Sequence, residues 1–213
     1  MTPTITMSAT AQHYLELEEQ YGAHNYHPLP VVLSRGKGVH VWDVDGKQYF
    51  DFLSGYSAVN QGHCHPAILQ TFIEQSQQLT LTSRAFHSDR LGEYVKFITD
   101  YFGYDKVLPM NTGVEAVETA IKLCRKWAYE VKGIEEHKAV ILVCEGNFHG
   151  RTSTVISFSS DPSARKNFGP YMPGFKAIPY SDPQALAVAL KDKNVAGFLV
   201  EPIQGEAGVL VPD

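Results

Sequence analysis

The second half of the chain alternates short apolar runs with segments of helical periodicity, and this order leaves few folds open. The apolar runs lie at 139–144 (AVILVC), 154–159 (TVISFS) and 197–202 (GFLVEP), and their length is typical of strands covered on both faces. Helices are predicted over 113–132, where apolar side chains recur with a period near 3.6, and over the segment DPQALAVALKD. Strands alternating with helices predict an α/β domain whose sheet is mostly parallel, with helices on both faces.

The N-terminal part has a different pattern. A short helix is predicted over 10–21, with a stop at Gly22. Residues 39–44 alternate apolar and polar side chains, and Asp45-Gly46 is a typical hairpin turn, after which QYFDFL returns as a second strand. This pattern predicts a small antiparallel unit.

Helical periodicity begins again at residue 67. Helices are predicted over 67–79 and 88–102, and KVLPM (106–110) is a candidate for a short strand. We therefore expect two parts: an N-terminal segment over 1–62, and the first part of a large α/β domain over 63–213. A parallel sheet that stops at VPD would leave an unpaired edge, so we expect the sheet to be incomplete.

Composition narrows the function classes. The formal net charge of -5 argues against a nucleic-acid partner, and no apolar run is long enough to cross a bilayer. The N-terminus has neither the basic and apolar regions of a secretory signal nor the Arg-rich pattern of an organellar one. The chain has three cysteines and no CxxC, so a reducing cytoplasm is the expected location.

The start of the long helix is a candidate anion site. In the sequence NTGVE, Thr112 and Glu115 have the spacing of a capping box. Gly113 allows close approach of the backbone, and the free amides and dipole of a helix start suit a phosphate. Most capping boxes bind nothing, so a purely structural role stays open.

Two further motifs follow predicted strands. In GNFHGR (146–151), Phe148 could stack on a flat ring, and Arg151 could hold a carboxylate through two parallel hydrogen bonds. In EPIQGE, Glu201 and Glu206 could act as acid or base, or pair with arginines. Ligands of open α/β sheets bind at this end of the strands, although an ordinary turn and a polar loop remain alternatives.

Other common sites find no support. The run His63-Cys64-His65 lacks the ligand spacing of a tetrahedral metal site, so no metal is predicted. The chain has no GxGxxG after a strand, no P-loop and no GxSxG elbow.

Taken in order, these motifs resemble one family. The sequence is similar to the ornithine aminotransferases, members of the class III (ω-aminotransferase) subgroup of fold-type I enzymes that depend on pyridoxal 5'-phosphate (PLP). The resemblance extends from about Tyr21 to Asp213. It is carried by YGAHNYHPLPV, SGYSAVNQGHCHP, LTLTSRAFH, VLPMNTGVEAVETAIKLCRKW, GNFHGRT, FGPYMPGF and VEPIQGEAGV.

The resemblance implies roles for particular residues. Phe148 would stack on the pyridine ring, and the cofactor-binding residues would be Thr112, Gly113, Val114, Phe148, His149 and Glu201. Arg151 would bind a substrate carboxylate, Tyr26 and Tyr56 would line the substrate pocket, and Glu206 would pair with a second arginine.

The implied reaction transfers the δ-amino group of L-ornithine to 2-oxoglutarate and yields glutamate 5-semialdehyde and glutamate. In the family, the lysine that forms the Schiff base lies beyond the position of residue 213. We therefore expect this chain to be an N-terminal portion that is inactive by itself, and the complete enzyme to be a homodimer.

Related activities remain as alternatives, namely transfer from acetylornithine or 4-aminobutyrate. The hydroxyls of Tyr26 and Tyr56 favour ornithine, which carries both an α-carboxylate and a free α-amino group. An alternative of another class is a non-catalytic, truncated protein that binds PLP or pairs with a full-length copy.

Overall fold

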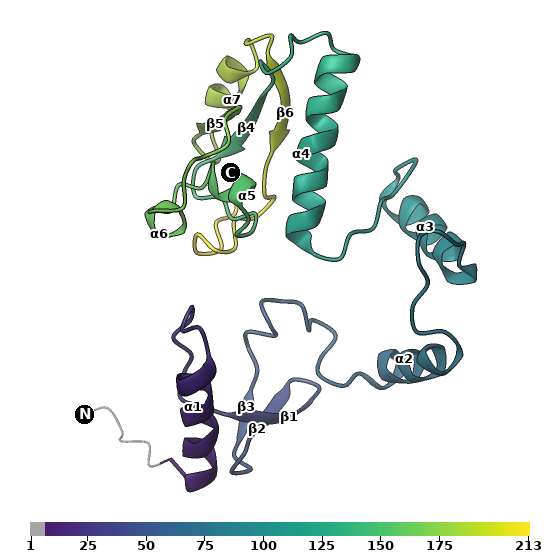
Figure 1. The fold of residues 1–213 in the computed structure, drawn as a ribbon, viewed down its shortest axis with the longest axis vertical. Helices are drawn as coiled ribbons and strands as arrows, with labels where there is room; N and C mark the ends of the chain where they lie inside the picture. Colours follow the sequence, from purple (N-terminus) through teal and green to yellow (C-terminus); the bar gives the residue numbers. More distant parts are fainter. Residues whose placement is uncertain (1–6) are drawn as a thin grey trace. The chain divides into compact units, whose positions relative to one another are not determined.

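The computed structural model describes residues 7–213 (Figure 1). The chain divides into two compact units, Met1–Glu93 and Tyr94–Asp213, which are described separately below. The boundary expected from the sequence, between 62 and 63, stays a prediction about domain organisation.

The first unit begins with helix α1 and a small antiparallel sheet. Helix α1 (Ala9–Tyr21) and the hairpin of β2 (His40–Asp43) and β3 (Gln48–Phe50) confirm the predictions. Gly46 has a φ of 84°, the left-handed conformation that a tight hairpin turn requires. The sequence did not reveal β1 (Leu33–Lys37), which pairs with β2 to give the order β1-β2-β3, because its side chains are mostly polar and exposed.

Two amphipathic helices follow. Helix α2 (Pro66–Gln78) and helix α3 (Asp89–Phe102) confirm the predictions for 67–79 and 88–102 within one residue at each end. Neither helix contains a buried residue in the part of the chain that the structure describes. Their apolar positions therefore contribute little to the core.

The second unit is built on a parallel sheet. Strands β4 (Val140–Cys144), β5 (Phe175–Ile178) and β6 (Val195–Leu199) have the order β5-β4-β6, and both neighbours of β4 run parallel to it. The predicted α/β class with a parallel sheet is confirmed. Strand β5 was not predicted from the sequence, because FKAI is a short run directly before a proline.

Alternate side chains of β4 build a core on each face of the sheet. Ile141 and Val143 pack with Ile121 of α4 (Gly113–Glu130), which runs alongside β6 in Figure 1. Leu142, on the opposite face, is fully buried in a cluster with Ala189 of α7 (Pro183–Ala189). Because both faces are covered, β4 is the rigid centre of this unit.

Two strand predictions are wrong. Residues 154–159 contain a short buried helix, α5 (Ser153–Ile156), since a continuous apolar run suits a buried helix as well as a buried strand. Residues 106–110 pair with no strand within residues 7–213, and Pro109 lacks the amide that a ladder needs. A one-turn helix that the sequence did not reveal, α6 (Pro162–Arg165), follows α5.

Candidate functional site

The first turn of α4 has the predicted capping box. The Thr112 hydroxyl accepts a hydrogen bond from the Glu115 amide at 3.2 Å, and the Glu115 carboxylate accepts one from the Thr112 amide at 3.1 Å. The first amides of a helix have no acceptor within the helix. The capping box supplies an acceptor for the amide of Glu115 but not for the amides of Gly113 and Val114. These two amides can therefore donate to an anion.

Replacing Thr112 by valine tests the cap. Valine keeps the shape but cannot accept from the Glu115 amide, so we expect the free energy of unfolding to fall by about 1 kcal/mol. Urea unfolding followed by circular dichroism measures the loss. Thr119→Val, a matched change inside α4 at a hydroxyl that donates to Met110 Sδ at 3.7 Å, should cost less. Equal losses in the two variants would show that the cap contributes nothing specific.

The 145–152 loop, which joins β4 to α5, lies against this helix start. Gly150 has a φ of 119°, and a Cβ atom there would lie 2.5 Å from Val114 Cγ2. At the far end of the loop, the Thr152 hydroxyl donates to the Glu118 carboxylate at 2.5 Å. The structure thus brings the NTGVE and GNFHGR motifs together, and Glu118 and Thr152 are contacts that the sequence did not single out.

The same loop is fixed to the sheet by buried polar groups. The side chain of Asn147, which is buried, donates to the carbonyls of Cys144 and Phe158, at 2.6 and 3.2 Å. Gln204 is 1% exposed and donates through Nε2 to the Glu145 carbonyl at 2.8 Å. Neither residue was identified from the sequence. The place of Gln204 inside a motif that follows a buried strand is a signal that could have identified it.

Glu201 connects the two loops at the carboxyl edge of the sheet. It follows β6 by two residues, and its Oε2 accepts a hydrogen bond from the Phe148 amide at 3.1 Å. Phe148 is 42% exposed, so its side chain is accessible to a ligand on which an aromatic ring could stack. The meeting of these loops agrees with the rule that ligands of open α/β sheets bind beyond the carboxyl ends of the strands.

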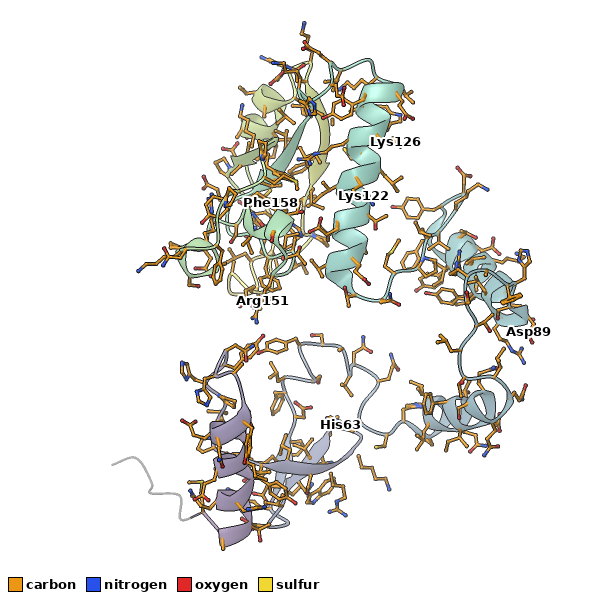
Figure 2. The ribbon with its side chains drawn as sticks, viewed as in Figure 1. His63, Asp89, Lys122, Lys126, Arg151 and Phe158 are labelled. Carbon is orange, nitrogen blue, oxygen red and sulfur yellow. The ribbon has the colours of Figure 1, made fainter. Side chains whose placement is uncertain are left out.

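His149 is a half-buried polar group with an unmet hydrogen-bonding atom. Its Nε2 is buried and has no hydrogen-bond partner within residues 7–213, while its ring packs beside Phe158, labelled in Figure 2. Burial lowers the pKa of His149, and the nearby Glu201 carboxylate opposes that shift. Burial therefore favours the neutral imidazole, and its Nε2 is left without a hydrogen-bond partner in the described part of the chain.

The remaining predicted residues are spread over both units. Arg151 lies directly before α5 and is exposed (Figure 2), and Glu206 is exposed in the loop after β6. Glu206 forms no ion pair within the described range 7–213, so its predicted arginine partner stays a prediction. Tyr26 and Tyr56, which are 50% and 73% exposed, belong to the first unit, and their relation to the site in the second unit stays a prediction.

Residues 7–213 contain neither a metal-ligating cluster nor a membrane-spanning helix. No group of three His, Cys, Asp or Glu side chains has a metal-binding arrangement. No helix is long and apolar enough to cross a membrane.

Comparison with known proteins places this geometry in a family. Residues 21–213 match the family described as aminotransferase class-III. The chain belongs to the class-III aminotransferases. Members of this family are PLP-dependent, so PLP is the cofactor that the family implies.

Among class-III aminotransferases, several relatives are very similar. The mitochondrial ornithine aminotransferase of Rattus norvegicus is 61% identical over 204 residues, which are 96% of this chain and 46% of the relative. A crystal structure of ornithine aminotransferase from Toxoplasma gondii matches 95% of this chain and 48% of its own with a TM-score of 0.94 and 51% identity. The acetylornithine aminotransferase from Elizabethkingia anophelis is 62% identical, with a TM-score of 0.82, over 95% and 49% of the two chains.

This chain spans about half the length of the curated relatives it matches.

The residues of the second unit fit PLP. The Gly113 and Val114 amides are available to a phosphate, Phe148 is partly exposed, and His149 has a buried nitrogen without a partner in the described part of the chain. Gly150 lacks the side chain that would separate the loop from the helix start.

Proposed function

We propose that the whole protein is an ornithine aminotransferase, which transfers the δ-amino group of L-ornithine to 2-oxoglutarate. The products would be glutamate 5-semialdehyde and glutamate. The observation that carries the choice of substrate is the agreement among the curated relatives. The rat ornithine aminotransferase is 61% identical over 96% of this chain, and the probable ornithine aminotransferase of Caenorhabditis elegans is 58% identical over 99%. The packing of the 145–152 loop on the first turn of α4 supports the cofactor site.

The cofactor would be held from the carboxyl edge of the parallel sheet. Gly113 and Val114 would donate their amides to the phosphate, and the helix dipole would add to the attraction. Phe148 would stack on the pyridine ring, its loop held by Glu201 through the 3.1 Å hydrogen bond. When bound, PLP supplies the electron sink for amino transfer.

The cofactor set has two further members. Thr112 would fix the helix start through its cap, and His149 would offer its neutral ring beside the cofactor.

The substrate would be placed by its charged groups. Arg151 would bind a carboxylate, a task for which the planar guanidinium is better suited than an ammonium. Tyr26 and Tyr56 would contact the amino donor so that its δ-amino group reacts. Glu206 would pair with a second arginine while ornithine is bound and release it for 2-oxoglutarate.

Acetylornithine is the second candidate donor, and the 62% identity to the Elizabethkingia anophelis enzyme favours it. The test uses the whole protein, expressed from its full native gene and loaded with PLP. We expect kcat/KM to be about tenfold or more higher with ornithine than with N-acetylornithine, with semialdehyde formation followed by mass spectrometry. The reverse preference would assign the protein to acetylornithine, and no turnover with either donor would overturn the proposal.

Two further parts of the proposal rest on the sequence. We keep a homodimer as the expected assembly, with no nucleic-acid or membrane partner. A cytoplasmic location is also kept, although the rat relative is named as mitochondrial. Fractionation of the source cells tests the location.

A further inference from the structure

The Tyr56 loop, residues 52–62 of the first unit, has an unusual backbone. Four consecutive residues, Ser54, Gly55, Tyr56 and Ser57, have φ between 51° and 67°. Three of them carry side chains, for which the left-handed conformation is unfavourable. Such a run persists only where the surrounding structure fixes it.

Asp51 holds the beginning of this loop. Its Oδ1 accepts hydrogen bonds from the amides of Leu53 and Ser54, at 3.0 and 2.8 Å. Its Oδ2 lies 2.6 Å from His63 Nε2, at the other end of the loop. Because a carboxylate can only accept, the imidazole is the donor. The Asp51 side chain is 16% exposed, so this contact is shielded from water.

His63 in turn is fixed to the small sheet. Its amide donates to the Gly38 carbonyl at 2.8 Å, and its carbonyl accepts from the Gly38 amide at 2.9 Å. Its ring lies on Gly36, where a Cβ atom would be 2.6 Å from the imidazole. The ring is thus held at both its base and its tip, beside the sheet of the first unit (Figure 2).

We propose that Asp51 and His63 are positioning residues, which close the ends of the Tyr56 loop and hold Tyr56 in the form that receives the amino donor. This inference rests on the proposed role of Tyr56 in the donor site. Neither residue need touch the substrate. Their hydrogen bond ties the start of the loop to the sheet and keeps the left-handed run in place.

The first unit offers a matched control. Asp43 also accepts from two backbone amides, those of Asp45 and Lys47, and from one side chain, the Tyr49 hydroxyl at 2.7 Å. This carboxylate organises the hairpin turn and not the Tyr56 loop. Tyr49→Phe and His63→Phe therefore each remove one donor to an aspartate and keep an aromatic ring.

The experiment uses the whole PLP-loaded protein with ornithine. In His63→Phe we expect amide hydrogen exchange over residues 52–62 to speed up about tenfold or more, since a hydrogen bond to a charged group is lost. KM for ornithine should rise about tenfold with kcat nearly unchanged, and KM for 2-oxoglutarate should stay the same. His63→Gln, whose amide can still donate to Asp51, should recover much of both losses. Tyr49→Phe should stay within about twofold of the wild type in exchange and KM.

The outcomes test the positioning role of Asp51 and His63 separately from the proposed role of Tyr56 in the donor site. Unchanged exchange in His63→Phe would overturn the proposal, whatever the substrate. Faster exchange with an unchanged KM would also overturn it if Tyr56→Phe by itself raises KM. If Tyr56→Phe has no effect on any amino donor, the proposed role of Tyr56 fails and the positioning proposal fails with it.

Discussion

Replacing Gly150 by alanine should destabilise the second unit. It should also remove most of the affinity of the whole protein for PLP. The added Cβ would lie 2.5 Å from Val114 Cγ2 and 2.7 Å from Val114 Cβ, and the φ of 119° is one that alanine rarely adopts. Overpacking and backbone strain together should lower the free energy of unfolding by about 2–4 kcal/mol. The loop can avoid the contact only by moving away from the amides of Gly113 and Val114.

Gly133→Ala is the control for backbone strain alone. Gly133 also has a positive φ, 76°, but a Cβ atom there would meet nothing within 4 Å. We expect it to cost about 1 kcal/mol and to leave PLP affinity unchanged. Urea unfolding and a fluorescence titration with PLP measure the two quantities. If Gly150→Ala behaved like Gly133→Ala in both, the contact between loop and helix start would have no part in cofactor binding.

The substitution Arg151→Lys should lower kcat/KM for ornithine by roughly 10- to 100-fold. The positive charge remains, but an ammonium cannot make two parallel hydrogen bonds to a carboxylate. The loss of one charge-assisted hydrogen bond, about 1.5–3 kcal/mol, corresponds to this range. Steady-state kinetics of the whole protein provide the measurement, and the affinity for PLP should change little.

Arg165→Lys is the matched control in the same unit. The Arg165 guanidinium lies over the Tyr171 ring at 4.4 Å and donates to the Ser159 carbonyl at 3.4 Å, so its contacts are structural. Its replacement should leave kcat/KM within about twofold. An Arg151→Lys enzyme with wild-type kinetics would exclude Arg151 from carboxylate binding.

The elements that the sequence predicted well are those whose own residues determine them. Helix α4 combines a capping box with a long helical period, and β2–β3 are joined by Asp45-Gly46. Strand β4 is a five-residue apolar run, and a central strand needs such a run because both its faces are covered.

The elements that were not predicted from the sequence depend on contacts with other parts of the chain. Strands β1 and β5 are edge strands, defined by hydrogen bonds to β2 and β4 more than by their own side chains. The run 154–159 is apolar because it is buried, and burial does not distinguish a helix from a strand.

The candidate site divides in the same way, into motifs that could be recognised in the sequence and contacts that could not. The motifs themselves were visible in the sequence, as was their place after strands or at a helix start. The contacts that join them were not visible, because Gly150 with Val114, Glu201 with Phe148 and Gln204 with Glu145 connect distant parts of the chain. The sequence gives no distance between such pairs until the sheet order is known.

The order β5-β4-β6 also bears on how the protein is made. Both partners of β4 follow it in the chain, so the strand that carries the 145–152 loop cannot be paired on both edges until Leu199 has been synthesised. The β1-β2-β3 sheet, by contrast, is complete at Phe50 and has only local pairings, which form early. At a synthesis rate of roughly 5–20 residues per second, several seconds pass between the synthesis of β4 and that of its second neighbour, β6. During that interval the apolar side chains of β4 lack the strands that flank them in the fold, and codons that slow translation between Cys144 and Leu199 should lengthen it.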